Sequence, residues 1–256
     1  MLSVLIAAAA LGQTVFIASD STASNYPDRS YPQTGWGQML PCALDGVKVE
    51  NRAIGGRSTR TFISEGRWEK LIADIQPGDT VLIQFGHNDA SRNRPERYAA
   101  AATDYRVNLT RFVTDVRARG GTPVLLTPVA RRSFNPDGTA KADFAEYASV
   151  AKSVAQETGT VLLDLGKLSR DWLTRTGAEK AKPFFLHYTP QDGQPAYPKG
   201  ISDDTHFSEL GARHVADLVA GELVRLNLPV GKAVRADRSG LTIDTAAGNR
   251  DCTPAR

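Results

Sequence analysis

Residues Thr80-Val81-Leu82-Ile83-Gln84-Phe85 carry the most continuous strand pattern in this chain of 256 residues. An apolar run of this length, rich in β-branched residues, predicts a buried strand. The polar segment Gly86-His87-Asn88-Asp89 follows it directly. Because ligands bind beyond the carboxyl ends of the strands in a parallel sheet, we expect these polar residues at the edge of a binding crevice.

Similar strand patterns recur along the chain and alternate with amphipathic stretches. Strands are predicted at residues 14–18, 47–51, 122–126 and 161–163. Helices are predicted at residues 104–119, 144–158 and 208–226. This alternation predicts a three-layer α/β/α fold, with a central parallel sheet of about five strands and helices on both of its faces.

Length and composition place these elements in one domain. A chain of 256 residues can bury a sizeable core without help from metals or many disulfides. We expect the catalytic domain at residues 14–228, followed by an irregular tail at residues 229–256. The net charge of +3 comes from 31 basic and 28 acidic side chains spread along the chain, and this small excess does not predict nucleic-acid binding.

The segment after the first predicted strand offers a nucleophile. Ser19-Asp20-Ser21-Thr22 breaks that strand, so the Ser21 hydroxyl is expected at the carboxyl edge of the sheet. There its backbone N–H would point at a bound carbonyl oxygen. The alternative is that these polar residues only cap a following helix.

Two further segments supply hydrogen-bond donors for an oxyanion. Gly55 and Gly56 follow the predicted strand at 47–51 and let the backbone turn with an amide exposed. Asn88 offers a neutral side-chain NH₂ group. His87 and Asp89, its neighbours, are expected to support this segment through hydrogen bonds.

A catalytic base is predicted in Asp203-Asp204-Thr205-His206. In a helical or turn-like backbone, Asp203 and His206 lie on the same side. The carboxylate can then fix the imidazole tautomer and stabilise the imidazolium formed when His206 takes the serine proton. Asp204 is expected to cap a helix or to face solvent. With Ser21, the pattern predicts acyl transfer through a serine.

These segments resemble the sequence blocks of the SGNH (GDSL-like) hydrolases, and more narrowly those of the rhamnogalacturonan acetylesterase branch. The resemblance rests on residues 19–22, 35–37, 51–58, 65–68, 84–89, 127–129 and 203–207. It implies a flavodoxin-like fold, Ser21 as nucleophile, and Asp203 and His206 as the rest of a triad. It also implies an oxyanion hole formed by Ser21, Gly56 and Asn88, and neither a metal nor another cofactor.

The activity implied by this resemblance is removal of O-acetyl groups from a plant cell-wall polysaccharide, above all rhamnogalacturonan, through an acetyl-enzyme on Ser21. One position departs from the family, because Ser19 stands where glycine is usual. A serine would be strained there if its φ had to be positive.

Three alternatives remain open from the sequence. An enzyme with the same triad could act on a lipid, a thioester or acetylated xylan. A non-catalytic carbohydrate-binding homologue is suggested only by Ser19. A metal site could instead be built from His87, Asp89, Asp203 and His206, although the serine, the amides and the asparagine would then have no role.

Candidate substrate-binding residues are arginines that follow predicted strands. Arg92, Arg94 and Arg97 come soon after Asn88, and Arg131 and Arg132 follow the strand at 122–126. Arginine can bind a carboxylate of an acidic polysaccharide bidentately, and the alternative is a set of solvated loop residues. Aromatic side chains between Phe184 and Tyr197 could stack on sugar rings.

The amino terminus is expected to direct export. Residues 2–11 are apolar but too short to span a bilayer, and small residues at Ala8 and Ala10 precede a candidate cleavage point within residues 1–13. No Lys or Arg precedes the apolar run, which argues against a signal. We nevertheless expect a secreted or periplasmic protein, because the implied substrate is extracellular. Cys42 and Cys252 allow either one disulfide that pins the tail to the first helix or two free thiols.

Overall fold

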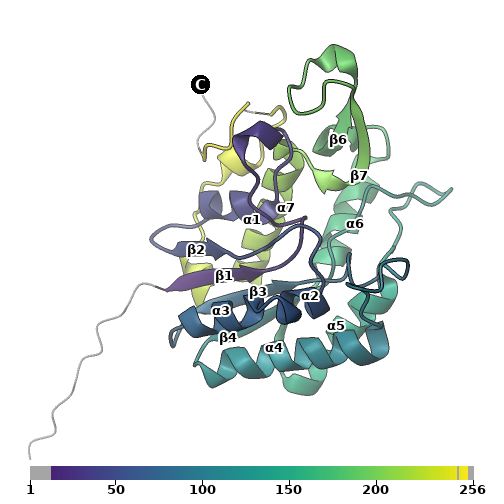
Figure 1. Cartoon of the computed structure of the whole chain (residues 1–256). Helices are drawn as coiled ribbons and strands as arrows, with labels where there is room; N and C mark the ends of the chain where they lie inside the picture. The colour runs from purple at the N-terminus through teal and green to yellow at the C-terminus, as the bar shows by residue number, and fades with distance from the viewer. Residues whose placement is uncertain (1–12, 247, 253–256) are drawn as a thin grey trace, which may run out of the picture.

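The structure, a computed structural model, describes residues 13–246 and 248–252 (Figure 1). At its centre is a five-stranded parallel sheet in the order β2-β1-β3-β4-β5. Its strands are β1 (Thr14–Ala18), β2 (Lys48–Asn51), β3 (Thr80–Gln84), β4 (Thr122–Leu126) and β5 (Val161–Leu163). The predicted strands are confirmed, and their order is the flavodoxin-like one.

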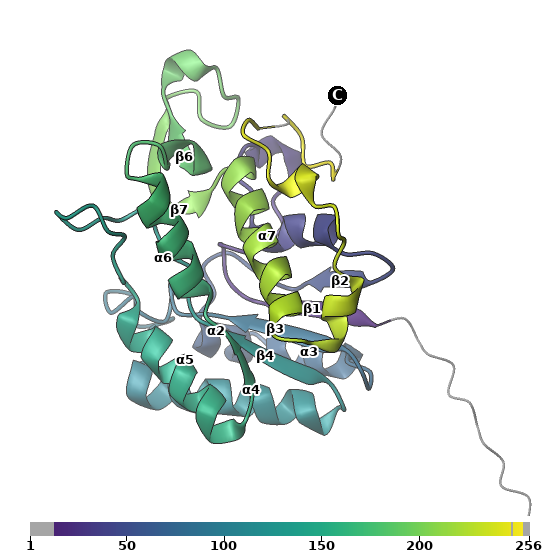
Figure 2. The same cartoon turned by 180° about the vertical axis from the view of Figure 1, so that it is seen from behind.

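Alternate residues of each strand pack on opposite faces of the sheet. Val15 and Ile17 of β1 belong to one apolar cluster, whereas Phe16 and Ala18 belong to the other. The first cluster is covered by α1 (Trp36–Met39), α6 (Leu165–Thr176) and α7 (Glu209–Arg225). The second is covered by α2 (Thr59–Ser64), α3 (Arg67–Asp74), α4 (Arg106–Ala118) and α5 (Ala145–Thr158). Figures 1 and 2 show the resulting three layers.

Three helices were predicted, and all three are confirmed to within two residues as α4, α5 and α7. The last begins where predicted because the Ser208 side chain accepts a hydrogen bond from the Gly211 amide and so caps the first turn. A π-helical turn at Ala101–Tyr105 leads into α4. Helices α3 and α6 were not predicted.

A second sheet, also not predicted, is an antiparallel hairpin of β6 (Phe185–Tyr188) and β7 (Ile201–Phe207). Figures 1 and 2 show it beside α6 and α7. Strand β7 leads directly into α7, so the last residues of the strand lie next to the first turn of that helix. The predicted base segment lies in this strand.

The chain after α7 packs back onto the domain. Val230, in a short helix at Pro229–Ala233, and Leu241, in another at Ser239–Leu241, are both buried in the cluster under α1 and α7. A disulfide joins Cys42 to Cys252, whose Cα atoms lie 4.8 Å apart. Of the two predicted alternatives, a disulfide or two free thiols, the disulfide is the one present. Because Cys42 lies in the turn directly after α1, the bond attaches the tail to this turn.

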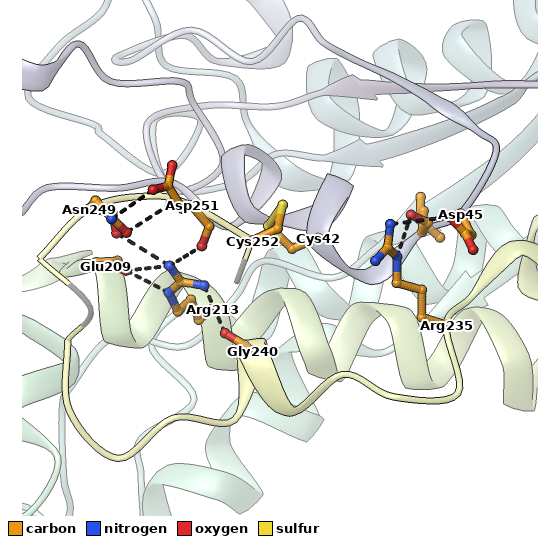
Figure 3. The surroundings of a disulfide bond; sticks show 10 residues. Cys42, Asp45, Glu209, Arg213, Arg235, Gly240, Asn249, Asp251 and Cys252 are labelled. Atoms are coloured by element: carbon orange, nitrogen blue, oxygen red, sulfur yellow. Dashed lines mark hydrogen bonds and ion pairs between the residues drawn. A yellow bond between two sulfur atoms is a disulfide. The ribbon is translucent and has the colours of Figure 1, made fainter. Parts of the chain in front are cut away.

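A buried arginine of α7 binds the backbone of the tail (Figure 3). Arg213 of α7 is fully buried, and its guanidinium pairs with Glu209 one turn earlier. It also donates to the carbonyl oxygens of Gly240 and Asp251, at 2.8 and 2.7 Å. The tail thus supplies the backbone acceptors that a buried guanidinium requires.

The predicted leader at residues 1–13 lies outside the described residues except for Gln13. Within residues 13–246 and 248–252, no helix combines the length and the apolar character needed to cross a membrane.

Candidate active site

Ser21 lies just beyond the carboxyl end of β1, where the strand order of the sheet reverses. Strand β1 pairs with β2 on one side and with β3 on the other. Connections therefore leave β1 and β3 toward opposite faces, and a crevice opens between the two strand ends. Ser21 and Asn88, which follow these strands, both line a cavity of about 650 Å³ at this edge.

Hydrogen bonds hold the backbone on both sides of Ser21. The buried Asp20 carboxylate accepts from the amide and the hydroxyl of Thr22, at 2.9 and 2.8 Å. The Tyr26 hydroxyl donates to the carbonyl oxygen of Ser21 over 2.8 Å. Ser19 needs no positive φ, since Asn227 is the sole non-glycine residue of the described chain with one. The departure from glycine therefore causes no strain.

Ser21, His206 and Asp203 are connected through their side chains. Ser21 Oγ lies 3.0 Å from His206 Nε2, and His206 Nδ1 lies 2.7 Å from Asp203 Oδ2. Burial alone would raise the pKa of Asp203. The His206 ring and the amides of Thr205 and His206 have the larger, opposite effect, and they lower the pKa of Asp203 to about 2. The ionised carboxylate holds a proton on Nδ1, which leaves Nε2 able to accept the serine proton.

A bulge in β7, not a helix, brings Asp203 and His206 together. Leu186 of β6 pairs with Asp203, whereas its neighbour Phe185 pairs with Phe207, so residues 204–206 have no partner across the hairpin. The Asp203 side chain accepts from the amides of residues 205 and 206, at 2.7 and 3.0 Å. The prediction that both side chains lie on one side is therefore confirmed.

Asp204 does not cap a helix, and its side chain, which is 40% exposed, faces solvent only in part. Its Oδ1 accepts from Arg132 Nη1 and from His187 Nε2, each at 2.7 Å. The Arg132 amide also donates to the Asp204 carbonyl oxygen over 2.8 Å. Burial raises the pKa of Asp204, but Arg132 and His187 outweigh it and lower that pKa. Asp204 thus ties the bulge to the loop after β4.

Three N–H groups converge on the cavity beside Ser21. Gly56 adopts a φ of +79°, and neither its amide nor that of Ser21 donates to another described residue. Asn88 Nδ2 donates one hydrogen to the carbonyl oxygen of Arg57 over 2.9 Å, which orients the amide. Its second hydrogen has no acceptor among the described residues. These three donors could stabilise the oxyanion of a tetrahedral intermediate.

The predicted substrate-binding arginines divide into two groups. Arg97 and Arg131 line the cavity, whereas Arg92 and Arg94 do not. Tight turns after Asn88 carry the latter two away, and the Arg92 guanidinium lies 5.6 Å from the centre of the Tyr98 ring. Arg132, which was expected at the same rim, is held by Asp204 instead.

The aromatic rings at the cavity were not predicted. Tyr26 and Phe144 line it, whereas Phe185, from the segment expected to offer stacking rings, is fully buried in the core. Tyr26 stands in a loop and Phe144 at the start of α5, and no sequence pattern marks either position. Only the fold brings them to the site.

His87 and Asp89 have different surroundings. Asp89 accepts hydrogen bonds from the amide and the hydroxyl of Thr59 at the start of α2, so its supporting role is confirmed. Burial raises the pKa of Asp89 to about 7. The His87 ring makes no hydrogen bond within the described chain. It contacts the Phe144 ring, with ring centres 4.3 Å apart and planes tilted by 51°, and its Nδ1 lies 3.5 Å from Asp20 Oδ2.

The four residues of the alternative metal site do not all contact one another and have different neighbours. Asp203 contacts His206, Asp89 contacts Thr59, and His87 lies beside Asp20. In the part of the chain that the structure describes, no three His, Cys, Asp or Glu side chains are grouped as metal ligands.

Comparison with known proteins identifies the family. Residues 20–214 match the model of the GDSL-like Lipase/Acylhydrolase family. The probable rhamnogalacturonan acetylesterase YesY of Bacillus subtilis (strain 168) is 39% identical over 225 residues, which cover 88% of this chain and 98% of YesY. The rhamnogalacturonan acetylesterase RhgT of the same organism is 39% identical over 217 residues, covering 84% of this chain and 91% of RhgT.

A solved structure supports the same assignment. The crystal structure of Bacillus subtilis YxiM superposes with a TM-score of 0.73 at 30% identity, over 85% of this chain and 58% of YxiM. The match to the family model begins at Asp20, beside the nucleophile, and ends within α7, beyond His206. This match includes Ser21, Asp203 and His206. The chain therefore belongs to the GDSL-like lipase/acylhydrolase family of ester hydrolases.

Proposed function

We propose that this protein is a serine acetylesterase that removes O-acetyl groups from rhamnogalacturonan through an acetyl-enzyme on Ser21. The observation that carries the proposal is the pair of contacts from Ser21 Oγ to His206 Nε2, at 3.0 Å, and from His206 Nδ1 to Asp203 Oδ2, at 2.7 Å, at the wall of an open cavity. The similarity to the rhamnogalacturonan acetylesterases YesY and RhgT, each 39% identical to this chain, supports the substrate.

The reaction follows from this geometry in two steps. Ser21 Oγ attacks the acetyl carbonyl carbon while its proton passes to His206 Nε2, and the amides of Ser21 and Gly56 with the Asn88 side chain stabilise the oxyanion. The C–O bond to the sugar then breaks, and the sugar oxygen takes the proton from His206. A water molecule next attacks the acetyl-enzyme with His206 as base, which releases acetate and restores the Ser21 hydroxyl.

The cavity favours a short acyl group on a polar alcohol. Arg97, Arg131, Ser91 and Asn88 contribute polar groups to its wall beside the rings of Tyr26 and Phe144. A long alkyl chain would place these groups against hydrocarbon, where polar groups without partners cost free energy. This lining argues against a lipase or a long-chain thioesterase.

Export from the cell is part of the proposal. The substrate is a wall polymer, and the disulfide between Cys42 and Cys252 suits an oxidising compartment. We therefore place the enzyme outside the cytoplasm, either secreted or periplasmic.

The test compares acetate release by the purified protein from acetylated rhamnogalacturonan and acetylated xylan with release of p-nitrophenol from p-nitrophenyl palmitate. We expect the first to be the best substrate by kcat/KM. A preference for the palmitate ester would contradict the acetylesterase proposal, and a preference for xylan would contradict its substrate. Absence of hydrolysis on all three, with p-nitrophenyl acetate also intact, would favour a non-catalytic homologue.

A further inference from the structure

Two arginines at the cavity have no acidic partner among residues 13–246 and 248–252. Neither Arg97 nor Arg131 forms a side-chain hydrogen bond or an ion pair with any described residue, and the Nε atom of each is buried without an acceptor. Arg132, the next residue along the chain, shows the contrast, because it donates to Asp204 and to the carbonyl oxygen of Ala178. A buried N–H group is normally paired, and both side chains are otherwise only partly buried, so their Nη groups can meet an anion that the described residues do not supply.

Arg97 lies beside the oxyanion donors. A methyl group placed on Gly56 would lie 3.7 Å from Arg97 Nη1, so the guanidinium packs over the glycine whose amide faces the cavity. Backbone hydrogen bonds fix this position. The Arg97 amide donates to Arg94, and that of Ala99 donates to Asp89 next to Asn88.

Arg131 lies on the side of the base. It lines the cavity together with Thr205 and His206. Its position follows from Arg132, whose amide and guanidinium both bind Asp204 in the same bulge as His206. His206 and Arg131 are therefore held by one network of contacts, and Arg97 and Arg131 line the same cavity as Ser21.

We propose that Arg97 and Arg131 form a carboxylate subsite, which binds a uronate carboxylate of the polymer close to the acetyl ester. This inference rests on the proposed function and adds to it the group on the polymer that is recognised. A guanidinium presents two parallel N–H donors to a carboxylate, and the galacturonate units of rhamnogalacturonan carry one carboxylate each. Acetylated xylan, whose backbone is neutral, does not supply this group.

The experiment compares one double variant on two forms of one substrate. An acetylated rhamnogalacturonan oligosaccharide is used as it is and after reduction of its carboxylates to primary alcohols. For R97Q/R131Q we expect kcat/KM on the acidic form to fall about ten- to a hundredfold, mainly through KM. The loss on the reduced form and on p-nitrophenyl acetate should be at least tenfold smaller. R97K/R131K should recover part of the activity on the acidic form, because charge is kept and the bidentate geometry is lost.

The matched control is R92Q/R94Q, which removes two charges from the same loop outside the cavity. It should match the wild type on both forms. Equal losses by R97Q/R131Q on acidic and reduced substrate would overturn the subsite, since the arginines would then stabilise the oxyanion or shape the site. If R92Q/R94Q lost as much activity on the acidic form as R97Q/R131Q, the subsite would also be overturned. The positive charge of the loop would then explain the preference for the acidic substrate without a specific site.

Binding provides a readout that does not depend on the proposed activity. Calorimetric titration of S21A with an unacetylated rhamnogalacturonan oligosaccharide should give an affinity that falls at least tenfold when R97Q and R131Q are added. Unchanged affinity would overturn the subsite even if the wild type proves active. A wild type that binds the acidic oligosaccharide through these arginines but releases no acetate from its acetylated form would instead contradict the proposed function alone.

Discussion

At the scale of single residues, replacing Ser21 with alanine removes the attacking oxygen and leaves the packing around it. We expect S21A to lose about a million-fold in kcat, the usual effect of removing a triad nucleophile. Circular dichroism should be unchanged, because Asp20, Thr22 and Tyr26 still hold the loop through the contacts described above. More than trace activity would mean that another group attacks the ester.

Asn88 should act on the transition state more than on the bound ester. N88A removes one oxyanion donor, and we expect kcat to fall about a hundred- to a thousandfold with little change in KM. The same substitution removes the hydrogen bond to the Arg57 carbonyl oxygen, so thermal unfolding is measured alongside. A raised KM at unchanged kcat would make Asn88 a substrate-binding residue instead.

Loss of turnover in mild acid should not come from protonation of Asp203. The pKa of Asp203 is about 2, so its carboxylate stays ionised throughout the range in which free imidazole titrates. The pH profile of kcat/KM should therefore show one acid-side ionisation. D203N, which loses the ionised partner, should lower kcat about ten-thousandfold. EDTA should have no effect, and activity lost in EDTA but restored by zinc would revive the metal site.

The same shift has a consequence for stability. Because the folded-state pKa of Asp203 lies below that of an unfolded aspartate, its ionised form stabilises the fold above about pH 4. That contribution is lost as the pH falls toward 2. Unfolding by urea at several acidic pH values, compared between D203N and the wild type, would measure it.

At the scale of elements, the bulge in β7 depends on Asp204. D204A removes the acceptor shared by Arg132 and His187, while Asp203 and His206 keep their own contact. We expect kcat to fall by up to about a hundredfold, because a small displacement of a catalytic group is enough for such a loss. The acid-side ionisation in the pH profile should persist. If D204A instead lowered kcat about ten-thousandfold, the loss expected for D203N, Asp204 rather than Asp203 would be the partner of His206.

Strands and long helices could be predicted because their burial follows simple periods. Strand β3 is buried at all its positions, and α4, α5 and α7 each bury one face over at least 13 residues. The hairpin of β6 and β7 could not be predicted, since Asp203 to His206 are polar and residues 204–206 form a bulge without a partner in β6. Helix α3 has only eight residues, which is too short for a distinct pattern.

The candidate site was predictable where a residue's role depends on its neighbours in sequence. Ser21 and Asn88 follow strands directly, and Asp203 stands three residues before His206. The positions of Tyr26 and Phe144 at the cavity could not be predicted, and neither could the ion pair between Arg132 and Asp204. Each brings together segments that are distant in sequence. The loop arginines divide between the cavity and solvent for the same reason.

At the scale of the whole molecule, the disulfide should contribute strongly to stability. It closes a loop of 210 residues, and loop entropy alone gives about 5 kcal/mol as an upper value. We expect C42S/C252S to unfold at a clearly lower temperature, with activity at 25 °C retained. Reduction of the wild type should have the same effect. An unchanged midpoint would mean that Arg213 and the packed tail suffice without the covalent bond.

The disulfide also makes most of the chain a closed covalent ring. A single proteolytic nick in any loop between residues 42 and 252 would leave both fragments tethered, so Asp203 and His206 would remain attached to the sheet. Ser21 precedes Cys42 and lies outside that ring. A cut between these two residues would release β1 with the nucleophile from covalent connection to the base. The short stretch from residue 22 to residue 41 is therefore the one whose cleavage would separate Ser21 from His206.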